Sequence, residues 1–130
     1  MSNFVLNDKQ TIFFSRLLLA VLVSSVYVNS WHGAFLLDDQ ITIVDNEAIR
    51  SLSLPWQFWD NVRRPIFFLT IALNYSVGKL DPFGYHLFNL LVHLAASQVL
   101  YLIISKTCLR LRPAWPLRQR DWFAFFAAAI

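Results

Sequence analysis

The chain has 130 residues, of which 57% are hydrophobic and only 15% carry a charged side chain. Soluble domains are nearer half apolar and about a quarter charged, so this composition excludes a typical water-soluble globular protein. The net charge is +3, but no basic face is free of adjoining apolar segments. We therefore expect no nucleic-acid partner.

The first apolar segment runs from Thr11 to Val28 and contains a single charged residue, Arg16. A membrane-spanning helix needs about 20 residues, and an arginine near one end can extend its side chain to the lipid headgroups. We predict a span at about residues 11–29. The alternative is a secretion signal whose cleavage site is formed by Val28 and Ser30, which a further apolar segment later in the chain disfavours.

Residues 30–84 form a loop that carries most of the acidic side chains. The sequence Asp45-Asn46-Glu47 predicts a turn or the start of a helix. Pro55 is suited to the first turn of a short helix. This helix would place three aromatic side chains at the level of the headgroups, namely Trp56, Phe58 and Trp59.

A second apolar run begins at Pro65 and ends before Gly78. Its 13 residues reach only about 20 Å as a helix, whereas the hydrocarbon core is about 30 Å thick. We therefore predict a juxtamembrane or re-entrant helix within the first external loop. The following sequence, Asp81-Pro82-Phe83-Gly84, predicts a turn.

A full-length span is predicted at residues 85–105, ended by Lys106. Residues 106–121 form a loop that is rich in lysine and arginine, which favours the cytoplasmic side. The N-terminus would then be cytoplasmic and residues 30–84 external. Residues 122–130 begin a third span that is too short to cross, so we expect a truncated chain. The expected fold is an all-α, multi-pass membrane protein.

The first candidate site is the acidic pair Asp38 and Asp39. Two adjacent carboxylates at a membrane surface repel each other, and an apolar wall raises their affinity for protons. Such a pair can supply a general base or hold a divalent cation. The alternative is two solvated loop acids without a chemical role.

The second candidate is Arg63-Arg64, which precedes Pro65. Two guanidinium groups at a helix N-terminus favour a phosphate site, because the free backbone N–H groups lie beside them. Contact with lipid headgroups is the alternative.

The third candidate is a polar stripe in the second predicted span. Its residues fall within about 80° of one another on the helix surface, so we expect it to face protein or water. Hydrogen bonding between helices without chemistry is the alternative. Metal binding is not expected, because the two histidines are about 10 Å apart along the helix. The stripe consists of His86, Asn89, His93 and Ser97.

Several motifs then occur in a characteristic order: Phe35-Leu-Leu-Asp-Asp-Gln, Ile43-Val-Asp-Asn, Trp59, Arg64 through Tyr75, and Asp81-Pro-Phe-Gly-Tyr-His continuing to His93. Together they resemble the N-terminus of the transmembrane and tetratricopeptide-repeat O-mannosyltransferase-like family, including its bacterial relatives. That family lies in the C-type glycosyltransferase superfamily. The resemblance covers about residues 17–105.

The resemblance implies a membrane enzyme that transfers a sugar from a polyprenyl-phosphate donor to a protein or glycan hydroxyl at the external face. Asp38 matches the catalytic base of the superfamily, and Asp39 takes the place of its second acidic residue. Arg64, with Arg63, would meet the donor phosphate. We assign the stripe residues of the matched motif to substrate binding as well: His86, Asn89 and His93.

The chain lacks most membrane helices and the repeat domain of that family, so we expect no activity from this fragment alone. The alternative function is a non-enzymatic membrane subunit or scaffold that associates through the polar stripe. A bacterial inner membrane is the expected location, or the endoplasmic reticulum in a eukaryotic host.

Overall fold

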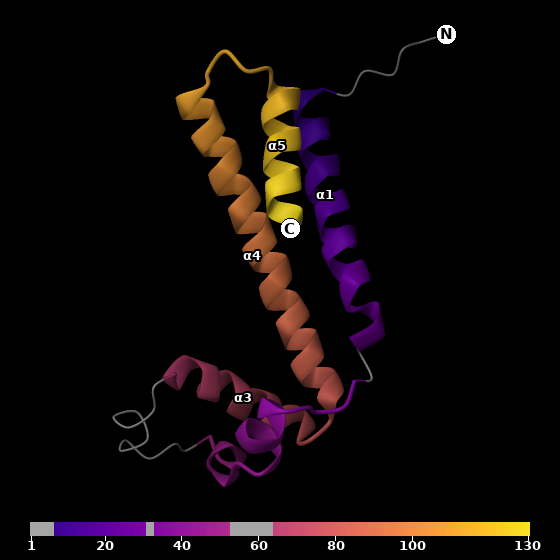
Figure 1. Cartoon of the computed structure of the whole chain (residues 1–130), viewed down its shortest axis with the longest axis vertical. Coiled ribbons are helices and arrows are strands. Elements are labelled where there is room, and N and C mark those ends of the chain that lie inside the picture. The colour runs from indigo at the N-terminus through magenta and orange to yellow at the C-terminus, as the bar shows by residue number, and fades with distance from the viewer. Residues whose placement is uncertain (1–6, 31–32, 53–63) are drawn as a thin grey trace. The chain divides into compact units, whose positions relative to one another are not determined.

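The computed structural model describes residues 7–30, 33–52 and 64–130, and every regular element within these ranges is helical. The all-α prediction is therefore confirmed for the described part of the chain. Two compact units are present (Figure 1). The span unit comprises Met1–Val28 and Leu90–Ile130, and the loop unit comprises Asn29–Asn89.

Helix α1, Asp8–Tyr27, begins with a reciprocal cap. The side chain of Asn7 accepts a hydrogen bond from the backbone N–H of Gln10 at 2.9 Å, and the Gln10 side chain accepts one from the N–H of Asn7 at 3.0 Å. A short 3-10 turn, η1 (Val28–Ser30), continues the helix. The 23 residues of this apolar stretch extend for about 34 Å, enough to cross a hydrocarbon core of about 30 Å.

Helix α4, Pro82–Leu111, is longer at both ends than the predicted span. Asp81 caps it by accepting a hydrogen bond from the N–H of Phe83 at 3.0 Å. The expected turn at residues 81–84 is therefore the first helical turn, and the chain reverses instead at Lys79, where φ is +56°. Lys106 does not end the helix, because lysine and arginine are good helix formers. The helix ends shortly before Pro113, since proline disfavours helical geometry in the preceding residue.

Helix α5, Leu117–Ala129, begins five residues before the predicted start at Trp122. Pro116 directly precedes it, in keeping with the preference of proline for helix starts. Within the span unit, the start of α1, the end of α4 and the start of α5 lie at the same end (Figure 1). The core of this unit is formed by Leu19, Tyr101, Ala124, Phe125 and Ala128.

Two long apolar helices thus have the length and composition to cross a membrane, as predicted. The rest of the chain covers little of either helix. In the most apolar stretch of each helix, 6% is buried in α1 and 17% is buried in α4. A core helix of a soluble protein would be mostly buried. Within the span unit, α1 packs against α5.

The loop unit has a small core of its own beneath the shorter apolar helix α3, Pro65–Gly78. As predicted, α3 begins at Pro65; it ends at Gly78, one residue later than expected, and its 14 residues extend for about 21 Å. A π-helical turn, η2 (Gln40–Val44), and a 3-10 turn, η3 (Glu47–Arg50), pack beside it. The buried side chains are Ile43, Ile49, Ile71, Ala72 and Tyr85.

The predicted helix start at residues 45–47 is confirmed, since the Asn46 side chain caps η3 by accepting a hydrogen bond from the N–H of Ala48 at 3.1 Å. The proposed helix carrying Trp56, Phe58 and Trp59 lies outside the described residues.

Candidate functional site

The acidic pair follows a segment that is anchored in the core of the loop unit. The ring of Phe35 packs edge-to-face on Tyr85, with the ring centroids 5.3 Å apart. The chain then turns at Leu37, which has φ of +51°, and Asp38 and Asp39 start the helical turn that leads into η2. The Phe35–Tyr85 contact and the turn at Leu37 together determine the position of the two carboxylates.

The two carboxylates have different surroundings. Asp39 is half-buried, and its Oδ2 lies 3.4 Å from the backbone nitrogen of Leu36, at the long end for a hydrogen bond. The Asp38 side chain is exposed, while its backbone carbonyl accepts a hydrogen bond from the Thr42 hydroxyl at 2.7 Å. Asp38 is therefore the more accessible of the two carboxylates, whereas Asp39 contacts the turn at Leu36.

The apolar wall expected around this pair is not formed by the described residues. Leu36 is 69% exposed and Leu37 is 91% exposed, so both point away from the core rather than over the carboxylates. Exposed leucines beside an acidic turn suit contact with a lipid surface.

His86 connects the beginning of α4 to the segment that carries the acidic pair. Its Nε2 lies 3.2 Å from the carbonyl oxygen of Gly33, a contact between residues 53 positions apart in the sequence. A side chain at position 33 would crowd this contact, because a Cβ there would lie 3.1 Å from the carbonyl oxygen of Ser30 and 3.4 Å from Nε2 of His86. His86 is thus a residue that positions the acidic segment.

Arg64 directly precedes α3 and is exposed. Its side chain makes no capping hydrogen bond, so the guanidinium group and the first N–H groups of α3 both remain available to an anion. Arg63, the other member of the predicted pair, lies outside the described residues.

The rest of the polar stripe has mixed surroundings. Asn89 and His93 are exposed, and the His93 ring lies 5.3 Å from that of Tyr27 within the span unit. Ser97 is buried and donates a hydrogen bond to the Leu94 carbonyl at 3.0 Å. The stripe therefore does not form one continuous polar surface within the described residues.

A buried carboxylate in the span unit was missed by the sequence analysis. Asp121 is only 2% exposed and accepts hydrogen bonds from the hydroxyl groups of Ser15 and Tyr101. The spacing of Asp121, Ala124, Phe125 and Ala128, which all lie buried on one face of α5, is a signal that could have found it.

The divalent cation suggested for Asp38 and Asp39 stays a prediction. Among the described residues, no group of three His, Cys, Asp or Glu side chains is placed to hold a metal ion. Calcium typically takes six to eight oxygen ligands, of which two carboxylates would supply only a part.

Comparison with curated proteins gives several related sequences. Human protein O-mannosyl-transferase TMTC3 is 32% identical over 104 residues, which cover 68% of this chain. Mouse TMTC2 is 31% identical over an alignment of 100 residues that covers 62% of this chain. Drosophila melanogaster Tmtc2 is 30% identical over an alignment of 138 residues that covers 94% of this chain. The chain is a distant homologue of the TMTC protein O-mannosyl-transferases.

The TMTC proteins are membrane glycosyltransferases, which agrees with the two apolar helices of this chain. The chain spans only 11% of the length of human TMTC3, 12% of mouse TMTC2 and 14% of the Drosophila Tmtc2. No family model and no solved structure matches the chain significantly.

Proposed function

We propose that this chain forms the donor-binding end of a membrane glycosyltransferase that moves a sugar from a polyprenyl phosphate to a protein or glycan hydroxyl at the external face. The homology with the TMTC protein O-mannosyl-transferases carries this proposal. The loop unit also carries an exposed acid, Asp38, and an exposed arginine, Arg64, which supports the proposal. As the chain covers a small part of these relatives, further segments would complete the active protein.

In the proposed reaction, the carboxylate of Asp38 takes the proton from the acceptor hydroxyl. The oxygen attacks the anomeric carbon while the bond from that carbon to the phosphate oxygen breaks. The polyprenyl phosphate leaves with the electron pair, and its charge is stabilised by Arg64 and the N-terminus of α3. Direct displacement of this kind inverts the anomeric centre.

His86 and Asp39 have supporting roles in this proposal. His86 holds the segment at Gly33, and Asp39 holds the turn at Leu36, so that Asp38 keeps its place. The substrate-binding assignments of Asn89 and His93 remain predictions from the matched motif.

The test is Asp38→Asn in the protein as its own cell makes it, assayed for transfer of labelled sugar from a polyprenyl-phosphate donor. The amide keeps the size of the side chain but cannot accept the proton, so transfer should fall by about 10²-fold or more. Glu47→Gln is the matched control, since Glu47 is an exposed acid of the same unit and its loss should leave the rate unchanged. Near wild-type transfer by Asp38→Asn would remove Asp38 from this role.

A membrane scaffold is the second candidate, favoured by the exposure of Asn89 and His93 on an apolar helix. If the chain is a scaffold, replacing both residues by Leu should abolish its association with partner membrane helices. If association is lost and no sugar transfer is detectable with the unchanged protein, the scaffold becomes the better account. For either function we propose a bacterial inner membrane, or the endoplasmic reticulum in a eukaryotic host.

A further inference from the structure

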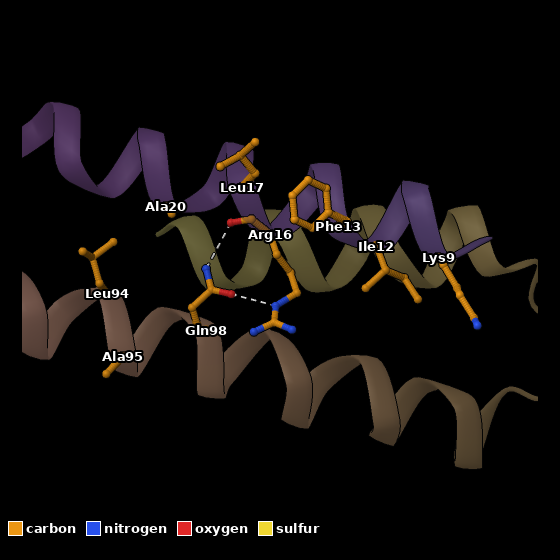
Figure 2. A pocket seen from close by; sticks show the side chains of 9 residues that line it. All are labelled: Lys9, Ile12, Phe13, Arg16, Leu17, Ala20, Leu94, Ala95 and Gln98. Atoms are coloured by element: carbon orange, nitrogen blue, oxygen red, sulfur yellow. Dashed lines mark hydrogen bonds between the residues drawn. The ribbon is translucent and has the colours of Figure 1, made fainter. Parts of the chain in front are cut away.

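A groove runs between α1 and α4 in the span unit (Figure 2). Its volume is about 680 Å³, within the range of about 300–1,000 Å³ that is typical of ligand sites. The walls are largely apolar, and the small side chains of Ala20 and Ala95 leave room between the helices. Two basic residues, Lys9 and Arg16, also line it.

Arg16 is held in place across this groove by Gln98 on the opposite helix (Figure 2). Its Nε donates a hydrogen bond to Oε1 of Gln98 at 2.9 Å, and Nε2 of Gln98 donates one to the backbone carbonyl of Arg16 at 3.2 Å. Among the described residues, none accepts a hydrogen bond from the two terminal nitrogens of Arg16. These nitrogens are therefore available to an anion, and their planar arrangement suits a phosphate.

The end of the span unit at which Lys9 lies is strongly basic. The start of α1, the end of α4 and the start of α5 meet there (Figure 1). Only two acids lie among the described residues of this unit, Asp8 and Asp121, and Asp121 is buried. An anionic headgroup is attracted to such an end. Outside the groove lining, the cations near the end of α4 and the start of α5 are Lys106, Arg110, Arg112, Arg118 and Arg120.

We propose that this groove binds one anionic phospholipid, with its phosphate between Lys9 and Arg16 and one acyl chain along Leu17, Ala20 and Ala95. The two cations are seven residues apart on α1, which is two turns or about 10 Å, and both side chains are long enough to reach a headgroup between them. The topology predicted from charge places this end at the cytoplasmic leaflet. The site is thus distinct from the proposed donor site, and it does not rest on the proposed function.

The headgroup is tested by native mass spectrometry of the purified chain with phosphatidylglycerol and phosphatidylcholine of identical acyl chains. One phosphatidylglycerol should be retained in preference, and Lys9→Gln with Arg16→Gln should weaken its binding about fivefold for each cation removed. The matched control, Lys106→Gln with Arg110→Gln, removes two cations from the same end but outside the groove, and should weaken binding clearly less than the groove pair does. Equal retention of both lipids, or an equal loss in the control, would overturn the proposal.

Binding of the acyl chain is tested by filling the groove with a larger side chain. Ala95→Leu should abolish retention of the bound lipid, whereas Ala96→Leu, which faces a different pocket, should not. Far-ultraviolet circular dichroism checks that both variants keep their helices. Unchanged lipid binding by Ala95→Leu would count against the groove as the site. A photoactivatable leucine at position 17 should label phospholipid in native membranes, and labelling of polypeptide instead would show that another protein segment fills the groove.

Discussion

The hydroxyl group of Tyr101 on α4 donates a hydrogen bond to the carboxylate of Asp121 on α5, and Tyr101 is 1% exposed and Asp121 is 2% exposed. Ser15 of α1 donates to the other oxygen of the same carboxylate. One buried acid therefore joins all three helices of the span unit. Polar groups in such a place are strongly constrained, because an unpaired partner cannot turn to water.

Replacing Asp121 by Ala should destabilise the span unit by about 1–3 kcal/mol, since two buried hydroxyl groups lose their acceptor. The free energy of unfolding is measured by titrating detergent-solubilised chain with dodecyl sulfate and following the loss of helix. Ser15→Ala should show a smaller loss, near the average of about 0.6 kcal/mol for a hydrogen bond in a membrane bundle. Its matched control is Ser25→Ala, because the Ser25 hydroxyl donates its hydrogen bond to Leu22 within the same helix. Equal losses in the two serine variants would contradict the network.

Arg64→Gln should weaken use of the lipid-linked donor several-fold while leaving folding intact, because the arginine is exposed and has no capping role. Removing a cation at a helix N-terminus weakens the binding of a phosphate. The apparent affinity for the donor is measured in membranes. Arg50→Gln serves as the control, as Arg50 is exposed in the same unit. An unchanged donor affinity in Arg64→Gln would make headgroup contact the better explanation.

His86→Ala should loosen the segment before the acidic pair without unfolding α4. The contact with the Gly33 carbonyl is lost, so backbone amides in residues 33–40 should exchange with deuterium faster, by about fivefold for a bond of about 1 kcal/mol. Hydrogen exchange with mass spectrometry measures this directly. Asn89→Ala provides the comparison, since Asn89 is exposed one turn further along the same helix. The same exchange rate in both variants would show that His86 does not restrain the segment.

The predicted topology places the loop unit outside and the α4–α5 connection inside. In a Cys108→Ser background, Ala48→Cys should react with an impermeant thiol reagent added to intact cells. Ala114→Cys should react only after the membrane is breached. Both positions are exposed, so access to the reagent depends on the side of the membrane alone, and the reverse pattern would invert the topology.

Local signals in the sequence were sufficient for α3 and for the start of η3. Pro65 marks a helix start by its fixed φ, and Asn46 marks a cap by its side chain. Gly78 lies at the end of α3 as expected, although the left-handed residue there is Lys79. These features depend on neighbouring residues only, which is why they are readable without the fold.

The early start of α5 was not predicted, because Arg118, Arg120 and Asp121 look like loop residues when charge is averaged over a segment. Their helix is stabilised by packing against α1, a contact between distant parts of the sequence. The candidate site likewise depends on contacts that the sequence alone does not show. The residues themselves and the resemblance nominated Asp38 and Asp39, but only the folded loop unit separates an exposed acid from one that holds the turn.

The pairing of Ser15 with Asp121 also sets an order of events during synthesis, since 106 positions separate the two residues. At about 5–20 residues per second, α1 would emerge about 5–20 seconds before α5 exists. During that interval, α1 would enter the membrane with a hydroxyl and a guanidinium group that lack their final partners. For that time, the Ser15 hydroxyl is left to backbone carbonyls of its own helix and the Arg16 guanidinium group to water and lipid headgroups, so both must exchange their partners when α4 and α5 arrive.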